Sequence, residues 1–159
     1  MKTLITDYFV EIKIDDNDFD FFNHWIWTYT PGHYARRKEN GVDLYLHIEI
    51  MKRDGRYEDG KQVDHKNRDR TDCQKDNLRM ATVSQNRRNR LQRNNQSRFR
   101  GIRPMGKGYQ AYTYENGVQI TIGTFNTELE AAIAYNNAVT ELFGEFAVLN
   151  DLKELNHVN

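Results

Sequence analysis

The stretch that decides the fold spans residues 62–90 and reads QVDHKNRDRTDCQKDNLRMATVSQNRRNR. A short apolar run ends on Asp64 and His65, and a loop rich in Asn, Asp and Thr follows over residues 67–76. Residues 77–81 return as a second apolar run. The pattern therefore predicts a strand, a loop and a second strand, with Asp64 and His65 at the end of the first strand.

The residues that follow predict a helix. Thr82 and Gln85 have the spacing of a capping box, which favours a helix over residues 83–94. Asp64 and His65 are then able to face the first turns of this helix. Helical spacing places four polar side chains on one side of it: Asn86, Asn89, Arg90 and Arg93.

These side chains suit the hydrolysis of a phosphodiester bond, which needs an activated water and neutralisation of developing negative charge. A histidine has an ordinary pKa near ~6.5, so His65 can accept the proton of the water at neutral pH. Asp64 and Asn86 offer the hard oxygen ligands that Mg²⁺ or Mn²⁺ prefers, and one ion per active site is expected. Helix phase alone does not separate Asn86 from Asn89 as the second ligand.

The run VDHKN…DNLRMATVSQNRRNR resembles the HNH endonuclease motif of the ββα-metal type, in the phage and intron homing-endonuclease branch. In that branch the last histidine is replaced by asparagine. His65 matches the first position, Asn77 the central one and Asn86 the third, so the resemblance selects Asn86 as the metal ligand. Asn77 is then expected to hydrogen-bond the loop backbone and hold His65 in place. The products implied are 5′-phosphate and 3′-hydroxyl ends.

Two positions of the loop depart from the family pattern. Arg68 stands where relatives commonly carry Gly, and Cys73 stands where they often have Asn. The segment LHIEIM before the motif also resembles the segment that precedes it in that branch, and a supporting role for His47 is left open.

Residues 1–60 predict an N-terminal segment that is rich in aromatic residues and β-strands. Strands are expected over residues 8–14 and 24–29, with a turn or helix start at residues 15–18. Asn40-Gly41 is the favoured pair for a two-residue hairpin turn. His47 is expected to open a short helix or to continue the hairpin strand.

The formal net charge of zero hides a segregation of charge. Residues 61–110 carry fourteen Lys and Arg against four Asp, whereas residues 111–159 carry one Lys against seven acids. Such a basic segment indicates a polyanion as the partner. Phosphate contacts are expected from its arginines: Arg87, Arg88, Arg90, Arg93, Arg98, Arg100 and Arg103.

Residues 97–150 predict three strands packed on one helix, with turns at residues 106–108 and 116–117 and a capping box at residues 127–130. The pattern FRGIR…GKGYQAYTYENGVQITIGTFNTELEAAIAYNNAVTELFGEFAVLN is similar to the Apetala-type/ERF DNA-binding domain. In that family the sheet lies in the major groove and strand side chains reach bases. The resemblance implies contacts from Arg100, Arg103, Lys107 and Tyr109, and Tyr112, Tyr114 and Gln119 are further candidates for DNA binding. These three and Thr121 occupy sheet positions where plant members often carry other residues, so the resemblance implies no sequence preference.

The fold class expected is α+β, built from small modules: an N-terminal aromatic β-hairpin region, a ββα-metal HNH module and a three-stranded antiparallel sheet packed on one helix. The boundaries expected are 1–50, 51–96 and 97–150, with a tail at 151–159. The single cysteine excludes an internal disulfide and a multi-cysteine zinc site. No apolar run of about 18 residues and no signal-peptide pattern occur, so a protein that is neither secreted nor membrane-bound is expected, in the cytoplasm of a phage-infected host.

Together these features predict a metal-dependent endonuclease that acts on double-stranded DNA as a monomer or weak dimer, with no protein partner evident. A catalytically inactive DNA-binding protein or transcriptional regulator derived from such a nuclease is the alternative. An RNA-binding or structural phage protein is the third interpretation.

Overall fold

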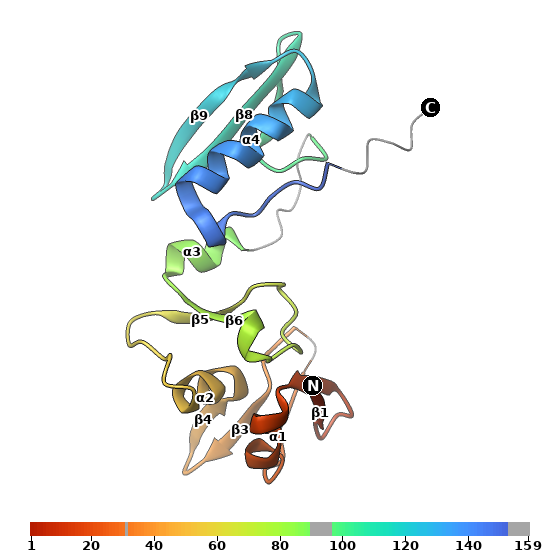
Figure 1. The fold of residues 1–159 in the computed structure, drawn as a ribbon, viewed down its shortest axis with the longest axis vertical. Helices are drawn as coiled ribbons and strands as arrows, with labels where there is room; N and C mark the ends of the chain where they lie inside the picture. The colour runs from red at the N-terminus through yellow and green to blue at the C-terminus, as the bar shows by residue number, and fades with distance from the viewer. Residues whose placement is uncertain (31, 90–96, 153–159) are drawn as a thin grey trace. The chain divides into compact units, whose positions relative to one another are not determined.

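The computed structural model describes residues 1–30, 32–89 and 97–152. It is an α+β structure with small antiparallel sheets, as the sequence predicts (Figure 1). The chain divides into two compact units, Met1–Asn86 and Arg87–Asn159. None of its described helices is both long and apolar enough to cross a membrane.

In chain order the elements are β1 (Lys2–Ile5), β2 (Glu11–Ile14), α1 (Asp16–Phe22), β3 (Arg36–Glu39), β4 (Val42–Tyr45), α2 (Leu46–Arg53), β5 (Gln62–His65), the 3-10 helix η1 (Lys75–Asn77), β6 (Leu78–Ala81), α3 (Val83–Arg88), β7 (Ile102–Met105), β8 (Gly108–Glu115), β9 (Val118–Phe125), α4 (Glu128–Phe143) and the 3-10 helix η2 (Gly144–Phe146).

The first unit opens with an antiparallel pair, β1 and β2, in which Leu4 lies opposite Ile12. Only the second half of the strand predicted over residues 8–14 is a strand. The first half belongs to the turn that joins β1 to β2, because the Thr6 hydroxyl oxygen accepts a 3.1 Å hydrogen bond from the Val10 amide. The strand prediction is therefore right at its end and wrong at its start.

The strand predicted over residues 24–29 is wrong. Thr28 alone forms an isolated bridge, with Arg36. The Trp27 indole is fully buried, and its Nε1 donates a 3.0 Å hydrogen bond to the carbonyl oxygen of Phe22. This segment therefore packs its aromatic side chain into the core instead of pairing its backbone in a sheet.

The hairpin predicted at Asn40-Gly41 is confirmed. Asn40 and Gly41 have φ values of 50° and 81°, the left-handed conformations that this tight turn requires. The turn joins β3 to β4, and α2 begins directly after β4 at Leu46. His47 therefore lies in the first turn of a helix, which decides between the two expectations for that residue.

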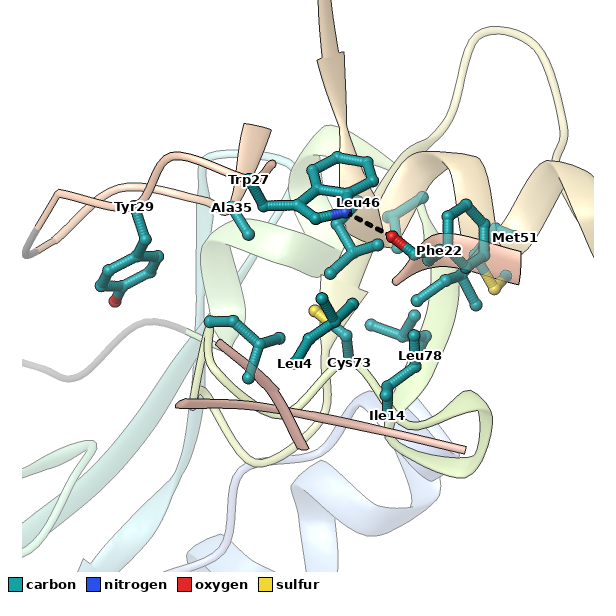
Figure 2. Close-up of a cluster of buried hydrophobic side chains, with 13 residues drawn as sticks. Leu4, Ile14, Phe22, Trp27, Tyr29, Ala35, Leu46, Met51, Cys73 and Leu78 are labelled. Carbon is teal, nitrogen blue, oxygen red and sulfur yellow. Dashed lines mark hydrogen bonds between the residues drawn. The ribbon is translucent and has the colours of Figure 1, made fainter. Parts of the chain in front are cut away.

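One hydrophobic core joins the N-terminal elements to the ββα stretch. Buried members come from β1 (Leu4), from α2 (Leu46) and from β6 (Leu78), and Cys73 of the loop lies among them (Figure 2). Because these side chains come from both ends of the unit, β5 and β6 are held in place by the N-terminal elements.

The second unit is a three-stranded antiparallel sheet in the order β7-β8-β9, with α4 across one face (Figure 1). The predicted capping box is confirmed: Thr127 Oγ1 accepts from the Glu130 amide, and the Glu130 side chain accepts from the Thr127 amide. Gly101 has a φ of 70°, and a Cβ there would lie 2.1 Å from the Tyr135 ring. The helix therefore approaches the backbone before β7 closely enough to require glycine.

An asparagine fastens the end of this unit to its beginning. Asn150 Oδ1 accepts a 2.7 Å hydrogen bond from the Arg100 amide, and Asn150 Nδ2 donates a 3.1 Å hydrogen bond to the Arg100 carbonyl oxygen. Asn136 of α4 binds the backbone of Asn150 in the same way. These contacts hold the last residue before the predicted tail, of which residues 153–159 lie outside the described part.

Candidate active site

The antiparallel pair β5–β6 positions the acid and the histidine on opposite faces. Asp64 lies opposite Arg79 and His65 lies opposite Leu78 in the register. Side chains alternate along a strand, so His65 faces the same side as Val63, which belongs to the core. Asp64 faces the other side, where its Oδ2 accepts from Arg79 Nε at 3.0 Å and from Nη2 at 2.9 Å.

His65 lies in a group of rings. Its imidazole stacks on the Tyr34 ring, with centroids 5.8 Å apart and planes inclined by 22°. The His47 ring lies 5.2 Å from that of His65 and 4.4 Å from that of Tyr34. On a further side, His65 Nε2 lies 3.8 Å from Cys73 Sγ. Only 3% of the His65 residue surface is exposed, so its orientation is set by these neighbours.

Burial keeps both histidines of this group uncharged at neutral pH. It lowers the pKa of His65 to about 4; the charges of Asp64 and Asp72 oppose this shift. Burial lowers the pKa of His47 to about 3, and His65 and Arg70 add to the shift. A neutral imidazole has a lone pair with which to accept a proton, so His65 is in the protonation state that a general base needs.

Asn77 holds together the loop that joins β5 to β6. Its Oδ1 accepts from the Asn67 amide at 3.0 Å, and its Nδ2 donates to the Asp72 carbonyl oxygen at 2.7 Å. The Nδ2 group also donates to Asn67 Oδ1 at 3.0 Å. These contacts close the loop directly after His65.

The loop is also bound to β2. The Lys13 amide donates to the Thr71 carbonyl oxygen at 2.7 Å, and the Cys73 amide donates to the Lys13 carbonyl oxygen at 2.9 Å. The Asp15 carboxylate accepts from the Lys75 amide at 2.7 Å. These partners lie about 60 residues apart in sequence, so the pattern of the motif alone held no signal for them.

Asn86 lies on the face of β5 that carries Asp64. Its Nδ2 donates to Gln62 Oε1 at 2.7 Å, and Gln62 and Asp64 share a strand face because they are two residues apart. The predicted capping box at the start of α3 is present, since Thr82 and Gln85 exchange hydrogen bonds of 2.8 and 3.2 Å. The helix ends at Arg88, earlier than predicted, and Asn89 follows in a turn.

The side chains on this face offer oxygen atoms of the kind that hard divalent cations prefer. Arg79 engages Asp64 through Oδ2, and Gln62 holds the nitrogen of the Asn86 amide, which directs Asn86 Oδ1 away from Gln62. One carboxylate and one amide oxygen suit Mg²⁺, which keeps several waters and completes its shell with substrate oxygens. No group of three or more His, Cys, Asp or Glu that could hold a metal occurs among the described residues.

The comparison with protein families agrees with this site. A model described as HNH endonuclease matches residues 44–88. Residues 44–88 are an HNH endonuclease domain. This domain starts in β4 and thus includes α2, with His47, as well as β5, β6 and most of α3.

One curated relative supports the same assignment. An uncharacterized HNH endonuclease of Acanthamoeba polyphaga mimivirus is 32% identical over 112 residues, which cover 70% of this chain and 58% of the relative. The chain therefore spans a little over half the length of that relative. No solved structure matches the chain.

The basic residues at the end of the HNH domain and beyond it have varied surroundings. Arg87 is exposed, whereas the Arg88 guanidinium lies 3.9 Å from the centroid of the Phe143 ring. Arg98 pairs with Glu128 at 3.4 Å. The expectations for Arg90 and Arg93 lie outside the described residues.

The face of the second sheet that points away from α4 carries a connected polar network. Arg103 donates from Nε and Nη2 to Gln110 Oε1, at 2.8 and 2.6 Å, and its guanidinium lies 4.9 Å from the Tyr112 ring. The Tyr112 and Tyr114 rings meet edge to face at 5.9 Å. Tyr114 Oη donates to Gln119 Oε1 at 3.3 Å, and Gln119 Nε2 donates to Thr121 Oγ1 at 3.5 Å. Lys107 is exposed in the turn before β8 and Tyr109 is half-buried in β8.

Proposed function

We propose that the protein is a metal-dependent endonuclease that hydrolyses phosphodiester bonds of double-stranded DNA to 5′-phosphate and 3′-hydroxyl ends. The observation that carries the proposal is the placement of an aspartate and a neutral histidine at consecutive positions of β5, inside an HNH endonuclease domain. Metal-assisted hydrolysis needs a metal ligand and a base, and β5 carries one on each of its faces.

His65 is the general base in this proposal. Its Nε2 faces the sulfur of Cys73, and the proposal places the proton of the neutral ring on Nε2 and the lone pair on Nδ1. Nδ1 then takes the proton of the attacking water. Asn77 supports this role indirectly, because its hydrogen bonds hold the loop that continues from His65.

Asp64 and Asn86 are the proposed metal ligands. Arg79 fixes the orientation of Asp64 through the two contacts to Oδ2. Gln62 orients the Asn86 amide, and this contact favours Asn86 over Asn89. When bound, Mg²⁺ or Mn²⁺ stabilises the negative charge of the leaving 3′-oxygen.

The second unit is proposed to hold the DNA. The similarity of residues 97–150 to the Apetala-type/ERF domain supports this, as do the arginine, tyrosine and glutamine side chains on the open face of the sheet. Arginine and glutamine contact base edges, and arginines also bind phosphate. The HNH domain is then the module that cuts the DNA, and the second unit is the module that binds it.

The test uses the full-length protein and phage genomic DNA, with and without Mg²⁺, followed by mapping of the ends. Cutting is expected only with the metal, and a nick is expected if each monomer carries one active site. His65→Ala should abolish cutting while DNA binding stays near that of the wild type, and His33→Ala, at an exposed histidine, should cut normally. Undiminished cutting by His65→Ala would disprove the mechanism, and binding without any cutting would favour an inactive DNA-binding protein.

A further inference from the structure

We propose that Arg70 is an additional catalytic residue of the HNH domain, whose guanidinium binds the scissile phosphate beside His65. The inference rests on the proposed nuclease function and extends it to a residue that the motif does not include. Three observations carry it: the position of the guanidinium, the lack of a neutralising carboxylate and the fixed backbone on both sides of Arg70.

The guanidinium of Arg70 is attached to the ring group of the site. It lies 4.5 Å from the centroid of the Tyr34 ring, and its Nη1 donates to the carbonyl oxygen of Gly32. The same Tyr34 ring stacks on His65. Tyr34 thus contacts both the cation and the base.

Arg70 carries an exposed charge that no acid neutralises. Among the residues that the structure describes, it forms no ion pair with a carboxylate, although several other arginines do: Arg36, Arg37, Arg53, Arg56, Arg79 and Arg98. The two nearest acids of the loop are otherwise engaged. Asp69 accepts from Thr71, and Asp72 accepts from Asn67 Nδ2 at 2.8 Å. A held, unpaired cation beside a base is suited to an anionic substrate.

The backbone around Arg70 is already ordered. Asp69 Oδ1 accepts from the Thr71 amide at 2.9 Å and from the Thr71 hydroxyl at 2.6 Å, which closes a tight turn centred on Arg70. Beyond the turn, Thr71 is bound to Lys13 of β2. Little reorganisation is therefore needed when a phosphate arrives, and preorganised donors of this kind stabilise charge in a transition state most effectively.

The chemistry assigns a separate part to each group. The water oxygen forms a bond to phosphorus while its proton passes to His65. The bond from phosphorus to the 3′-oxygen breaks, and its electron pair stays on that oxygen. Negative charge grows on the non-bridging phosphoryl oxygens during this step, and the Arg70 guanidinium donates hydrogen bonds to them.

Arg68 provides a matched control. It lies on the same loop, is exposed and carries the same charge, but the structure gives it neither an aromatic support nor a carboxylate partner. The variants to compare are Arg70→Ala, Arg70→Lys and Arg68→Gly. The substrate is bis(4-nitrophenyl) phosphate with Mg²⁺ or Mn²⁺, because so small a diester reports on the active site without the DNA-holding unit.

Arg70→Ala is expected to lower kcat by roughly 100-fold with little change in KM, the effect of removing one donor to a developing charge. Arg70→Lys should recover only part of the rate, since it lacks the planar fork, and added guanidinium should partly rescue Arg70→Ala. Arg68→Gly should match the wild type. Tyr34→Leu should lower kcat, because it removes the aromatic ring on which Arg70 lies. Circular dichroism melts confirm that each variant is folded.

The possible failures are distinguishable. If the wild type hydrolyses the diester or DNA and Arg70→Ala does so equally fast, the inference is wrong and the nuclease function stands. If the wild type hydrolyses neither the diester nor DNA, the nuclease function is wrong. The contact between Arg70 and a DNA phosphate is then tested without an activity assay. Modification of the wild type by phenylglyoxal, mapped by mass spectrometry, should then be slowed at Arg70 and unchanged at Arg68 when duplex DNA is bound. Equal modification at Arg70 with and without DNA would overturn the contact.

Discussion

His65 Nε2 lies 3.8 Å from the sulfur of Cys73, and both residues are buried in the same unit. The only cysteine of the chain is therefore a neighbour of the proposed general base, and it is also a member of the hydrophobic core (Figure 2). The core and the site share residues, so changes to one are expected to affect the other.

The first prediction concerns this thiol. Burial raises the pKa of Cys73 far above its ordinary range, so little reactive thiolate forms in the folded protein. Reaction with 5,5′-dithiobis(2-nitrobenzoate) should be very slow in the native protein and rapid in guanidinium chloride. Fast, complete reaction of the native protein, with its circular dichroism unchanged, would contradict the buried position.

The second prediction concerns stability against acid. The folded protein holds His47 with a pKa of about 3, below its ordinary value, so the unfolded chain binds a proton more readily. Stability is therefore complete above a pH of about 6.5 and is lost as the pH falls toward the folded pKa, by about 1.4 kcal/mol per pH unit for one such group. Urea unfolding at several pH values measures this slope. His47→Phe should flatten it, and His33→Phe, at an exposed histidine, should not; equal slopes for both would refute the assignment.

The third prediction concerns the loop position at which relatives commonly have glycine. Arg68 has a φ of 68°, the left-handed conformation that an arginine adopts only with strain. Arg68→Gly should stabilise the protein by about 0.5–1 kcal/mol, the relief of strain less the extra entropy of glycine in the unfolded chain. Arg68→Ala removes the same side chain but keeps the Cβ, so it should give no such gain in a urea titration.

The fourth prediction concerns Asn77. Asn77→Ala removes the hydrogen bonds to Asn67 and to the backbone of Asp72, which should cost about 1–3 kcal/mol of stability. Cleavage should fall by about 10–100-fold, the typical effect of losing a supporting contact around a metal site. Loss of stability without loss of cleavage, measured well below the melting temperature, would make Asn77 a purely structural residue.

The fifth prediction separates Asn86 from Asn89 as the metal ligand. Asn86→Ala should raise the Mg²⁺ concentration needed for half-maximal cleavage by about tenfold or more, and Asn86→Asp should not, because it keeps an oxygen ligand. Gln62→Ala should have a smaller effect in the same direction, since it removes the partner that orients Asn86. Asn89→Ala should leave the Mg²⁺ requirement unchanged; the reverse result would make Asn89 the ligand.

Local patterns predicted the elements that carry the site. The structure confirmed three local predictions: the capping boxes at Thr82 and Thr127 and the turn at Asn40-Gly41. Their hydrogen bonds and φ values involve residues at most a few positions apart, so the local sequence is enough to predict them. The strand at residues 24–29 was wrong for the opposite reason. Its alternating pattern is the same whether the backbone pairs in a sheet or the Trp27 ring fills a core, and only packing decides between them.

The amino-acid sequence by itself determined the strand, loop, strand and helix of residues 62–88 and the placement of Asp64 and His65 at the end of the first strand, since these follow from short-range spacing. Tertiary structure alone decided what surrounds them. Tyr34 and His47 reach His65 from segments 18 or more residues away, and Arg70 of the loop lies on Tyr34, which is outside the motif. Such contacts depend on how distant segments share one core, and the burial that lowers the pKa of His65 comes from the same packing.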